Sequence, residues 1–296
     1  MLSVLIPTYN YEIRPLVESL HHQAVEQGLD FEIIVIEDGS TRCIEENATI
    51  LSLAGCRHIV LPRNVGRSAI RNRLADEAMY DNLLFLDCDA RLHSDYFISK
   101  YIPFFGESTV VLGGRVYDPN DQDPRFSLMR EYGAARERND LENLKNRRKH
   151  PMFTTPNFLI PKSVFLQVRF DEDIVGYGHE DTVFGIRLHE LGIPFLFVDN
   201  PVIHVGLQDN EQFLQKTRNA IFNLYRLWQS NRFPLLVSES KLLSTYRKIK
   251  RFGLRPFFAL GYDLFNKIMQ KRLCGKHPSL FVFDLYKIFF LCKIAR

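Results

Sequence analysis

The sequence has few cysteines, and none of them lies at the spacing of a metal or redox motif. The five cysteines are scattered along 296 residues without a Cys-x-x-Cys pair: Cys43, Cys56, Cys88, Cys274 and Cys292. This argues against a disulfide framework and against a cysteine zinc site, because both need paired cysteines. The cysteines indicate reduced thiols, and we therefore expect a cytoplasmic protein.

Long apolar runs are lacking as well. No stretch of about 18 apolar residues occurs, so we expect no membrane span. Residues 1–7 have neither a basic segment nor a cleavage site, so we expect no secretion signal. With 46% hydrophobic and 25% charged residues, the composition is that of a globular protein and excludes disorder as the main state.

The formal net charge of +3 conceals a strong asymmetry along the chain. Residues 241–296 have 13 basic and two acidic residues, a net charge of +11. The preceding 240 residues have 25 basic and 33 acidic residues, a net charge of −8. An acidic body with a basic tail predicts that the tail has a partner of its own.

Short apolar runs alternate with helical patterns over the first 90 residues. The apolar runs are 2–6, 31–36, 59–61 and 83–86. Apolar residues at helical spacing lie between them, over 13–25 and 69–79. Continuous apolar runs of this length are typical of parallel strands that are buried on both faces. The first 90 residues therefore predict an α/β fold.

The rest of the chain predicts further elements. We expect strands at 110–116, 158–160, 195–198 and 202–205. We expect helices at 182–191, 210–229 and 256–272. Residues 125–150 interleave acids and bases, which predicts a solvated helix or a mobile loop.

Polar residues follow three of the predicted strands, at the point where each strand ends. They are Thr8 to Asn10, Glu37 to Ser40, and Asp87 to Asp89. In open α/β sheets, ligands bind beyond the carboxyl ends of the strands. Asp87 and Asp89 together could reach a divalent cation and the sugar of a nucleotide, since manganese and magnesium prefer oxygen ligands and accept phosphate as a co-ligand. An Asp-x-Asp pair alone is explained equally well by a turn.

Six motifs in a fixed order resemble those of the family 2 glycosyltransferases of GT-A fold. They are Pro7-Thr8-Tyr9-Asn10, Glu37-Asp38-Gly39-Ser40, Asn64-x-Gly66-x-Ser68-x-x-Arg71-Asn72, Asp87-x-Asp89, Thr155-x-Asn157-Phe158-Leu159-Ile160 and Gly176-Tyr177-Gly178-His179-Glu180-Asp181. The resemblance covers about residues 2–207. It implies a Rossmann-like mixed sheet sandwiched by helices in a catalytic domain at 1–207. Residues 208–296 would then form a helical, basic, amphipathic extension.

The resemblance also implies roles for single residues. Those implied for the nucleotide are Pro7, Thr8, Tyr9, Asp38, Arg71 and Asp87. Asp89 and His204 would ligate the metal, and Asp181 would be the catalytic base. Residues implied to bind the sugar or the acceptor are Asn157, His179 and Glu180.

Other interpretations of these residues remain open. Glu180 and Asp181 precede a predicted helix, where they could simply favour its dipole. His204 could be an ordinary surface or hydrogen-bonded histidine. His179 lies where relatives commonly have a small residue, which leaves the preferred sugar undecided.

The implied reaction is transfer of a hexose from a nucleotide sugar, with UDP as the expected nucleotide, to a glycan or lipid-linked glycan in surface polysaccharide synthesis. A metal would neutralise the diphosphate leaving group, and one carboxylate base would suffice for single displacement with inversion. Two alternatives are transfer to a protein or small-molecule acceptor, and an inactive relative that only binds sugar nucleotide or glycan.

The basic tail predicts a membrane contact. Residues 256–272 are amphipathic, and residues 280–292 are almost entirely apolar but too short to span a bilayer. A basic amphipathic segment with aromatic residues fits an anionic lipid surface, which would place the protein on the inner face of the cytoplasmic membrane. Alternatively, these helices pack on the catalytic domain or form a homodimer. No base-reading motif accompanies the charge, so we expect no nucleic acid partner.

Overall fold

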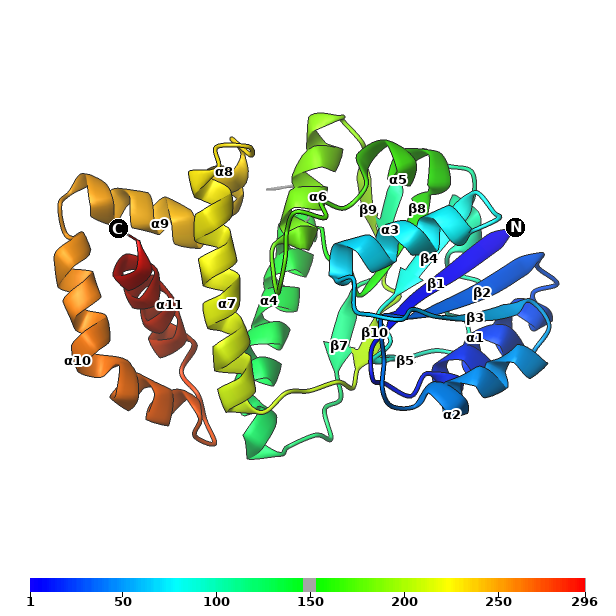
Figure 1. The fold of residues 1–296 in the computed structure, drawn as a ribbon, viewed down its shortest axis with the longest axis horizontal. Helices are drawn as coiled ribbons and strands as arrows, with labels where there is room; N and C mark the ends of the chain where they lie inside the picture. Colours follow the sequence, from blue (N-terminus) through cyan, green and yellow to red (C-terminus); the bar gives the residue numbers. More distant parts are fainter. Residues whose placement is uncertain (146–152, 296) are drawn as a thin grey trace.

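The computed structural model describes residues 1–145 and 153–295 and has a seven-stranded mixed sheet at its centre (Figure 1). Its first half is parallel: β1 (Leu2–Thr8) lies between β2 (Phe31–Glu37) and β4 (Asn82–Leu86), and β3 (Cys56–Val60) pairs with β2. These are the four strands that the apolar runs predict. The side chains of β1, β2 and β4 are almost all buried because helices cover both faces of the sheet, whereas the edge strand β3 is only partly buried.

The second half of the sheet is mixed. β8 (Asn157–Pro161) pairs antiparallel with β4 and with β6 (Val110–Leu112), and β9 (Phe195–Phe197) pairs parallel with β6. The strand order is β3-β2-β1-β4-β8-β6-β9. The predicted α/β class and mixed sheet are therefore confirmed.

Helices cover the two faces of this sheet. α1 (Arg14–Glu26) packs on one face, and α3 (Arg67–Glu77), α5 (Lys162–Val168) and α6 (Glu180–Glu190) pack on the other. A short helix, α2 (Ile44–Ala48), lies between β2 and β3. Single turns of 3₁₀ helix occur at Thr49–Ser52, Ile102–Phe104 and Pro124–Phe126.

The prediction of a single strand at 110–116 is wrong. The chain forms β6 in the large sheet and β7 (Arg115–Tyr117) in a second sheet of order β5-β10-β7. The strand breaks at Gly113 and Gly114, and Gly114 has a φ of +76°. A Cβ at Gly113 would lie 2.1 Å from the Tyr101 hydroxyl, so only glycine fits there. In the second sheet β10 (Val202–His204) is central and runs antiparallel to β5 (Ala90–Leu92).

The C-terminal part is helical. It contains α7 (Asn210–Gln229), α8 (Leu236–Glu239), α9 (Lys241–Arg251), α10 (Arg255–Leu273) and α11 (Leu280–Ile294). Figure 1 shows α9, α10 and α11 at the end of the molecule away from β1 to β3, with α7 and α4 (Ser127–Lys145) between them and the sheet. The charged segment predicted at 125–150 is thus helical as far as residue 145, and residues 146–150 lie outside the described residues.

The apolar segment at 280–292 lies within α11, which packs against α7, α9 and α10 and contributes to two apolar clusters. Its apolar character is therefore explained by these packing contacts. α10 is different, because an apolar side of it remains exposed, with Phe257 71%, Leu264 61% and Ile268 67% exposed. Among the residues that the structure describes, no helix is both long and apolar enough to span a membrane.

Candidate active site

The polar residues that follow β1 and β2 meet at one edge of the sheet. The two strands are in register, with Thr8 opposite Glu37. The segments that follow the two strands remain hydrogen-bonded to each other: Asp38 N donates to Thr8 O (2.8 Å), and Asn10 N donates to Ser40 Oγ (2.9 Å). This edge is where the alternation of strands and helices predicts a ligand.

Three residues predicted to bind the nucleotide lie at the end of β1. Thr8 is buried, and its hydroxyl donates to the backbone carbonyl of Ile6 within β1 (3.4 Å). Pro7 is half-buried, whereas the Tyr9 ring is 53% exposed beside them. Of the three, Tyr9 therefore offers the largest free surface to a flat aromatic base.

Glu37 is buried below this edge and is a structural residue that the motif comparison left without a role. Its carboxylate accepts from Ser40 Oγ (2.5 Å) and Asn47 Nδ2 (2.7 Å), and it lies 3.3 Å from His58 Nε2. Burial raises the pKa of Glu37, but these hydrogen bonds together outweigh burial and hold the pKa below its ordinary value. Glu37 therefore fixes the loop after β2 as a carboxylate.

Asp38 holds the next loop. Its two carboxylate oxygens accept from the backbone N–H groups of Val65 (2.6 Å) and Gly66 (3.1 Å), and Asn64 Nδ2 donates to its carbonyl (3.0 Å). These bonds draw the start of α3 towards the strand edge. Each oxygen keeps a second lone pair, so the predicted contact to a nucleotide base remains a prediction.

Asp87 is paired with a buried arginine. Arg71 is only 2% exposed, and its Nη2 donates to Asp87 Oδ1 at 2.5 Å. Burial raises the pKa of Asp87, but the charges of Arg71 and Arg67 outweigh it and hold the pKa below the ordinary value. Arg71 therefore positions Asp87 as a carboxylate at the end of β4.

Asp89 and His204 are brought together from distant parts of the sequence. β10 runs antiparallel to β5 with His204 opposite Ala90, so His204 Nδ1 lies 3.3 Å from Asp89 Oδ1. His204 is 9% exposed, and its Nε2 has no hydrogen-bond partner within the described part of the chain. The carboxylate also packs on Gly206, where a Cβ would lie 2.3 Å from Asp89 Oδ2.

This pair fits a divalent cation. Two cis ligands of an octahedral ion with bonds of about 2.1 Å lie about 3 Å apart. The unpartnered imidazole nitrogen also leaves this histidine with unused bonding capacity. Among the side chains described in residues 1–138 and 153–295, no cluster of three or more His, Cys, Asp or Glu could hold a metal. The remaining ligands would thus come from phosphate and water, which is usual for magnesium and manganese at nucleotide sites.

The loop before α6 has an unusual backbone. Gly176, Gly178 and His179 all have positive φ angles, and the φ of +75° at His179 is uncommon for a residue with a side chain. Burial lowers the pKa of His179, against the opposing charge of Asp181. A glycine would adopt this conformation more readily than a histidine.

Glu180 faces the site and not the N-terminus of its own helix. It is 4% exposed, its Oε1 accepts from Arg67 Nη1 (3.1 Å), and its Oε2 has no partner within the described residues. A role limited to the helix dipole does not account for this ion pair. Asp181 is half-buried, and its Oδ1 accepts from Thr182 N (2.7 Å).

Arg67 joins the two carboxylate motifs. Burial lowers its pKa, but the charges of Glu180, Asp87 and Asp89 together raise it above the ordinary value. Its guanidinium also lies 5.1 Å from the centre of the Tyr177 ring. The sequence alone did not single out Arg67, because the motif at 64–72 leaves position 67 unspecified. Its place inside that motif was the signal that could have identified it as a site residue.

Asn157, which the resemblance places at the sugar or the acceptor, is held within the protein by three hydrogen bonds, and its role in binding stays a prediction. It is 1% exposed, and its amide donates to the carbonyls of Gly114 (3.1 Å) and Asn200 (2.8 Å). Its Oδ1 accepts from the Tyr101 hydroxyl (2.6 Å). Both amide hydrogens are used, so Asn157 joins the two sheets and has no donor left for a substrate.

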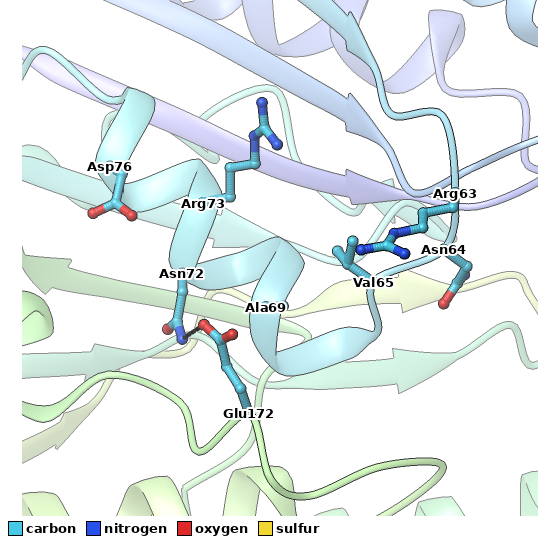
Figure 2. A pocket seen from close by; sticks show the side chains of 8 residues that line it. All are labelled: Arg63, Asn64, Val65, Ala69, Asn72, Arg73, Asp76 and Glu172. Carbon is cyan, nitrogen blue, oxygen red and sulfur yellow. Dashed lines mark hydrogen bonds between the residues drawn. The ribbon is translucent and has the colours of Figure 1, made fainter.

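A separate pocket of about 550 Å³ lies on the outer side of α3 (Figure 2). Figure 2 shows that it is lined by the loop before α3, by α3 itself and by Glu172, which accepts from Asn72 Nδ2 (2.8 Å). No residue predicted to bind nucleotide, sugar or metal lines it. The strand edge, with its paired carboxylates and arginines, is therefore the better candidate site.

Comparisons with known proteins identify the family and the fold. A model of the family described as "Glycosyl transferase family 2" matches residues 3–169. The chain is 31% identical over 230 residues to validoxylamine A glucosyltransferase of Streptomyces hygroscopicus subsp. limoneus, an alignment that covers 66% of this chain. It covers 49% of that enzyme, so the chain spans about half the length of this relative.

Two solved structures share the fold. One is a mannosyltransferase of Pyrobaculum calidifontis in complex with GDP-Man and Mn²⁺ (TM-score 0.57, 12% identity, 99% of this chain and 85% of that one). The other is glucosyl-3-phosphoglycerate synthase of Mycobacterium tuberculosis in complex with Mn²⁺, UDP and phosphoglyceric acid (TM-score 0.53, 18% identity, 76% and 78%). At these identities the likeness concerns the fold alone.

Proposed function

Because the chain belongs to glycosyltransferase family 2, we propose that it transfers a sugar from a nucleotide sugar to an acceptor hydroxyl, with inversion at the anomeric carbon. The observation that carries the proposal is the position of Arg67, which pairs with Glu180 and lies within electrostatic reach of Asp87 and Asp89. The donor and catalytic motifs therefore meet at one edge of the sheet. Such an arrangement suits a dianionic leaving group next to a carboxylate base.

The donor site would use the end of β1 for the base and the end of β4 for the sugar and phosphates. The exposed Tyr9 ring would stack on the base, and Asp87, held by Arg71, would accept from the ribose. We propose UDP as the nucleotide. GDP is the alternative, because the structural neighbours are complexes with UDP and with GDP-Man.

Asp89 and His204 would hold manganese or magnesium. When bound, the metal neutralises charge on the diphosphate as the glycosidic bond breaks. The distance of 3.3 Å between His204 Nδ1 and Asp89 Oδ1 supports this assignment.

Asp181 would remove the proton of the acceptor hydroxyl while its oxygen attacks the anomeric carbon. The bond from that carbon to the diphosphate oxygen breaks, and the nucleoside diphosphate leaves with the electron pair. One base opposite the leaving group suffices, so no second enzymic nucleophile is needed. The unpartnered Oε2 of buried Glu180 would accept a hydrogen bond from a hydroxyl of the donor sugar. His179 would lie beside that sugar.

The acceptor would be a glycan or a lipid-linked glycan, delivered at a membrane by the domain proposed at 208–296. The exposed side of α10 supports this proposal: Phe257, Leu260, Leu264 and Ile268 lie on one side of the helix and are 54% to 71% exposed. We call these four residues the α10 stripe. The tail around it has a net charge of +11, which suits an anionic lipid surface. A homodimer that covers the same stripe is the alternative.

The decisive test is a panel of nucleotide sugars with manganese, scored for hydrolysis and thermal stabilisation. We expect one UDP-sugar to be hydrolysed and turnover to stop when the metal is chelated. Binding without hydrolysis or transfer would favour the alternative of an inactive binding protein. Absence of binding to any nucleotide sugar would contradict the donor proposal.

A further inference from the structure

The helix α7 lies beyond the matched span of 3–169, yet it supports the loop that leads to Asp181. Asn223 Nδ2 donates to the carbonyls of Val175 and Tyr177, at 3.1 Å each. Gly178 packs so closely on Ala220 that a Cβ at Gly178 would lie 2.8 Å from the Ala220 Cβ. This part of α7 is therefore a wall of the candidate site.

Lys216 lies one turn before Ala220 on the same side of α7, since residues four apart share a helix face. Its Nζ lies 5.2 Å from the centre of the Tyr177 ring. The guanidinium of Arg67 lies 5.1 Å from the centre of the same ring. Two cations from distant helices therefore share one aromatic side chain at the site.

The charge of Lys216 is not balanced by a neighbouring acid. Arg67 is paired with Glu180, and Arg71 with Asp87, but among the side chains described in residues 1–138 and 153–295 no carboxylate lies at ion-pair distance from Lys216. Burial lowers the pKa of Lys216, the charge of Arg67 lowers it further, and Asp89 opposes both. Lys216 is thus a partly buried cation near the Asp89 end of the site. A ligand of high negative charge would compensate it.

We propose that Lys216 is a donor-binding residue whose ammonium contacts the diphosphate of the nucleotide sugar beside Asp89. This inference rests on the proposed reaction, in which the diphosphate is the leaving group. Lys216 stays protonated and donates hydrogen bonds, so it stabilises the charge on the departing diphosphate without transferring a proton. The helical extension would then contribute directly to donor binding.

The test compares Lys216→Met and Lys216→Arg with a matched control, Arg226→Met, which removes an exposed cation from the same helix. Calorimetry with manganese would measure the affinities for UDP, GDP, inorganic pyrophosphate and uridine. We expect Lys216→Met to weaken binding of the diphosphates roughly 10- to 100-fold, as for a lost hydrogen bond to a charged group. Uridine affinity should not change, Lys216→Arg should recover most of the loss, and Arg226→Met should match the wild type.

Equal affinities for diphosphates in the wild type and Lys216→Met would overturn the inference. Equal losses for uridine and diphosphate would also overturn it, because they would indicate a damaged site. If the wild type binds pyrophosphate through Lys216 but binds no nucleoside diphosphate, the donor proposal fails, and Lys216 binds a diphosphate anion that is not part of a nucleotide sugar. If the wild type binds none of these probes, both are wrong.

Discussion

Charged side chains are buried at the strand edge, whereas apolar side chains are exposed on the α10 stripe. At the strand edge, Arg71 is buried against Asp87, and Arg67 is paired with buried Glu180. On α10, large apolar side chains such as Leu264 and Ile268 face outwards in a strongly basic segment. Buried ions are costly unless they are paired, and exposed apolar patches are uncommon unless something binds them. Each region therefore departs from the usual arrangement at a place where we propose that a ligand binds.

The largest expected effect is at the strand edge and concerns catalysis. Asp181→Asn removes the proposed base and should lower kcat by about 10² to 10⁴-fold, the usual contribution of a general base. The affinity for UDP with manganese should stay the same, since Asp181 is not placed in the donor site. Steady-state transfer assays and calorimetry on the same preparation would measure both. Normal turnover would exclude Asp181 as the base.

The next effect is on stability. Arg71→Met leaves Asp87 without its buried partner and should lower the free energy of unfolding by about 3–5 kcal/mol. The double variant Arg71→Met/Asp87→Asn should recover part of this loss, because the unpaired charge is gone. Chemical denaturation of the three proteins would measure it. Equal stability of the wild type and Arg71→Met would show that this ion pair does not hold the edge together.

A smaller effect is expected on the α10 stripe. Leu264→Glu should weaken binding to vesicles that contain anionic lipid by about 1.5–3 kcal/mol, the value of burying one leucine. Folding should be unaffected, because Leu264 is 61% exposed. Thr245→Glu is the matched control: it adds the same charge at an exposed position of α9. Vesicle sedimentation in which both variants bind like the wild type would contradict the membrane proposal, and loss of a dimer on Leu264→Glu would favour the homodimer.

The smallest effect concerns acid stability. The pKa of Glu37 is below its ordinary value of 4.5, so the carboxylate stabilises the fold above that pH, and the contribution is lost as the pH falls through the lower folded-state pKa. Glu37→Gln should therefore lose less stability than the wild type between about pH 5 and pH 3. Unfolding curves at several pH values would test this. Parallel profiles for the two proteins would rule out a contribution from Glu37.

Local pattern was enough to predict much of the fold and the donor edge. The apolar runs at 2–6 and 83–86 are continuous because both faces of β1 and β4 are covered, and their polar ends follow directly in the sequence. The break at Gly113 and Gly114 was not predicted because local pattern alone does not distinguish two glycines within a strand from a break between two strands. The crowding by Tyr101 that demands glycine comes from a segment that is distant in the sequence.

Other features depend on how helices pack, which periodicity does not determine. The pattern of α10 predicts an apolar side, but it does not tell which of its apolar residues are covered. In the structure Phe258 packs on the ring of Phe289, whereas Phe257 is 71% exposed. Likewise, nothing in the sequence near Lys216 indicates that α7 crosses the loop at 175–178. Asn157 also has hydrogen-bond partners on three other segments, which its place in the sequence motif does not reveal.

The hydrogen bonds from Asn223 to the loop at 175–177 have a consequence for cooperativity. Any molecule that binds this loop in its ordered form also favours conformations in which α7 is docked, because the two are linked thermodynamically. Amide hydrogens of α7 should therefore exchange more slowly when nucleotide is present, although the matched family span ends at residue 169. A chain cut before α7 would lose more than its tail: the loop that presents Asp181 would have to order itself at the moment of binding.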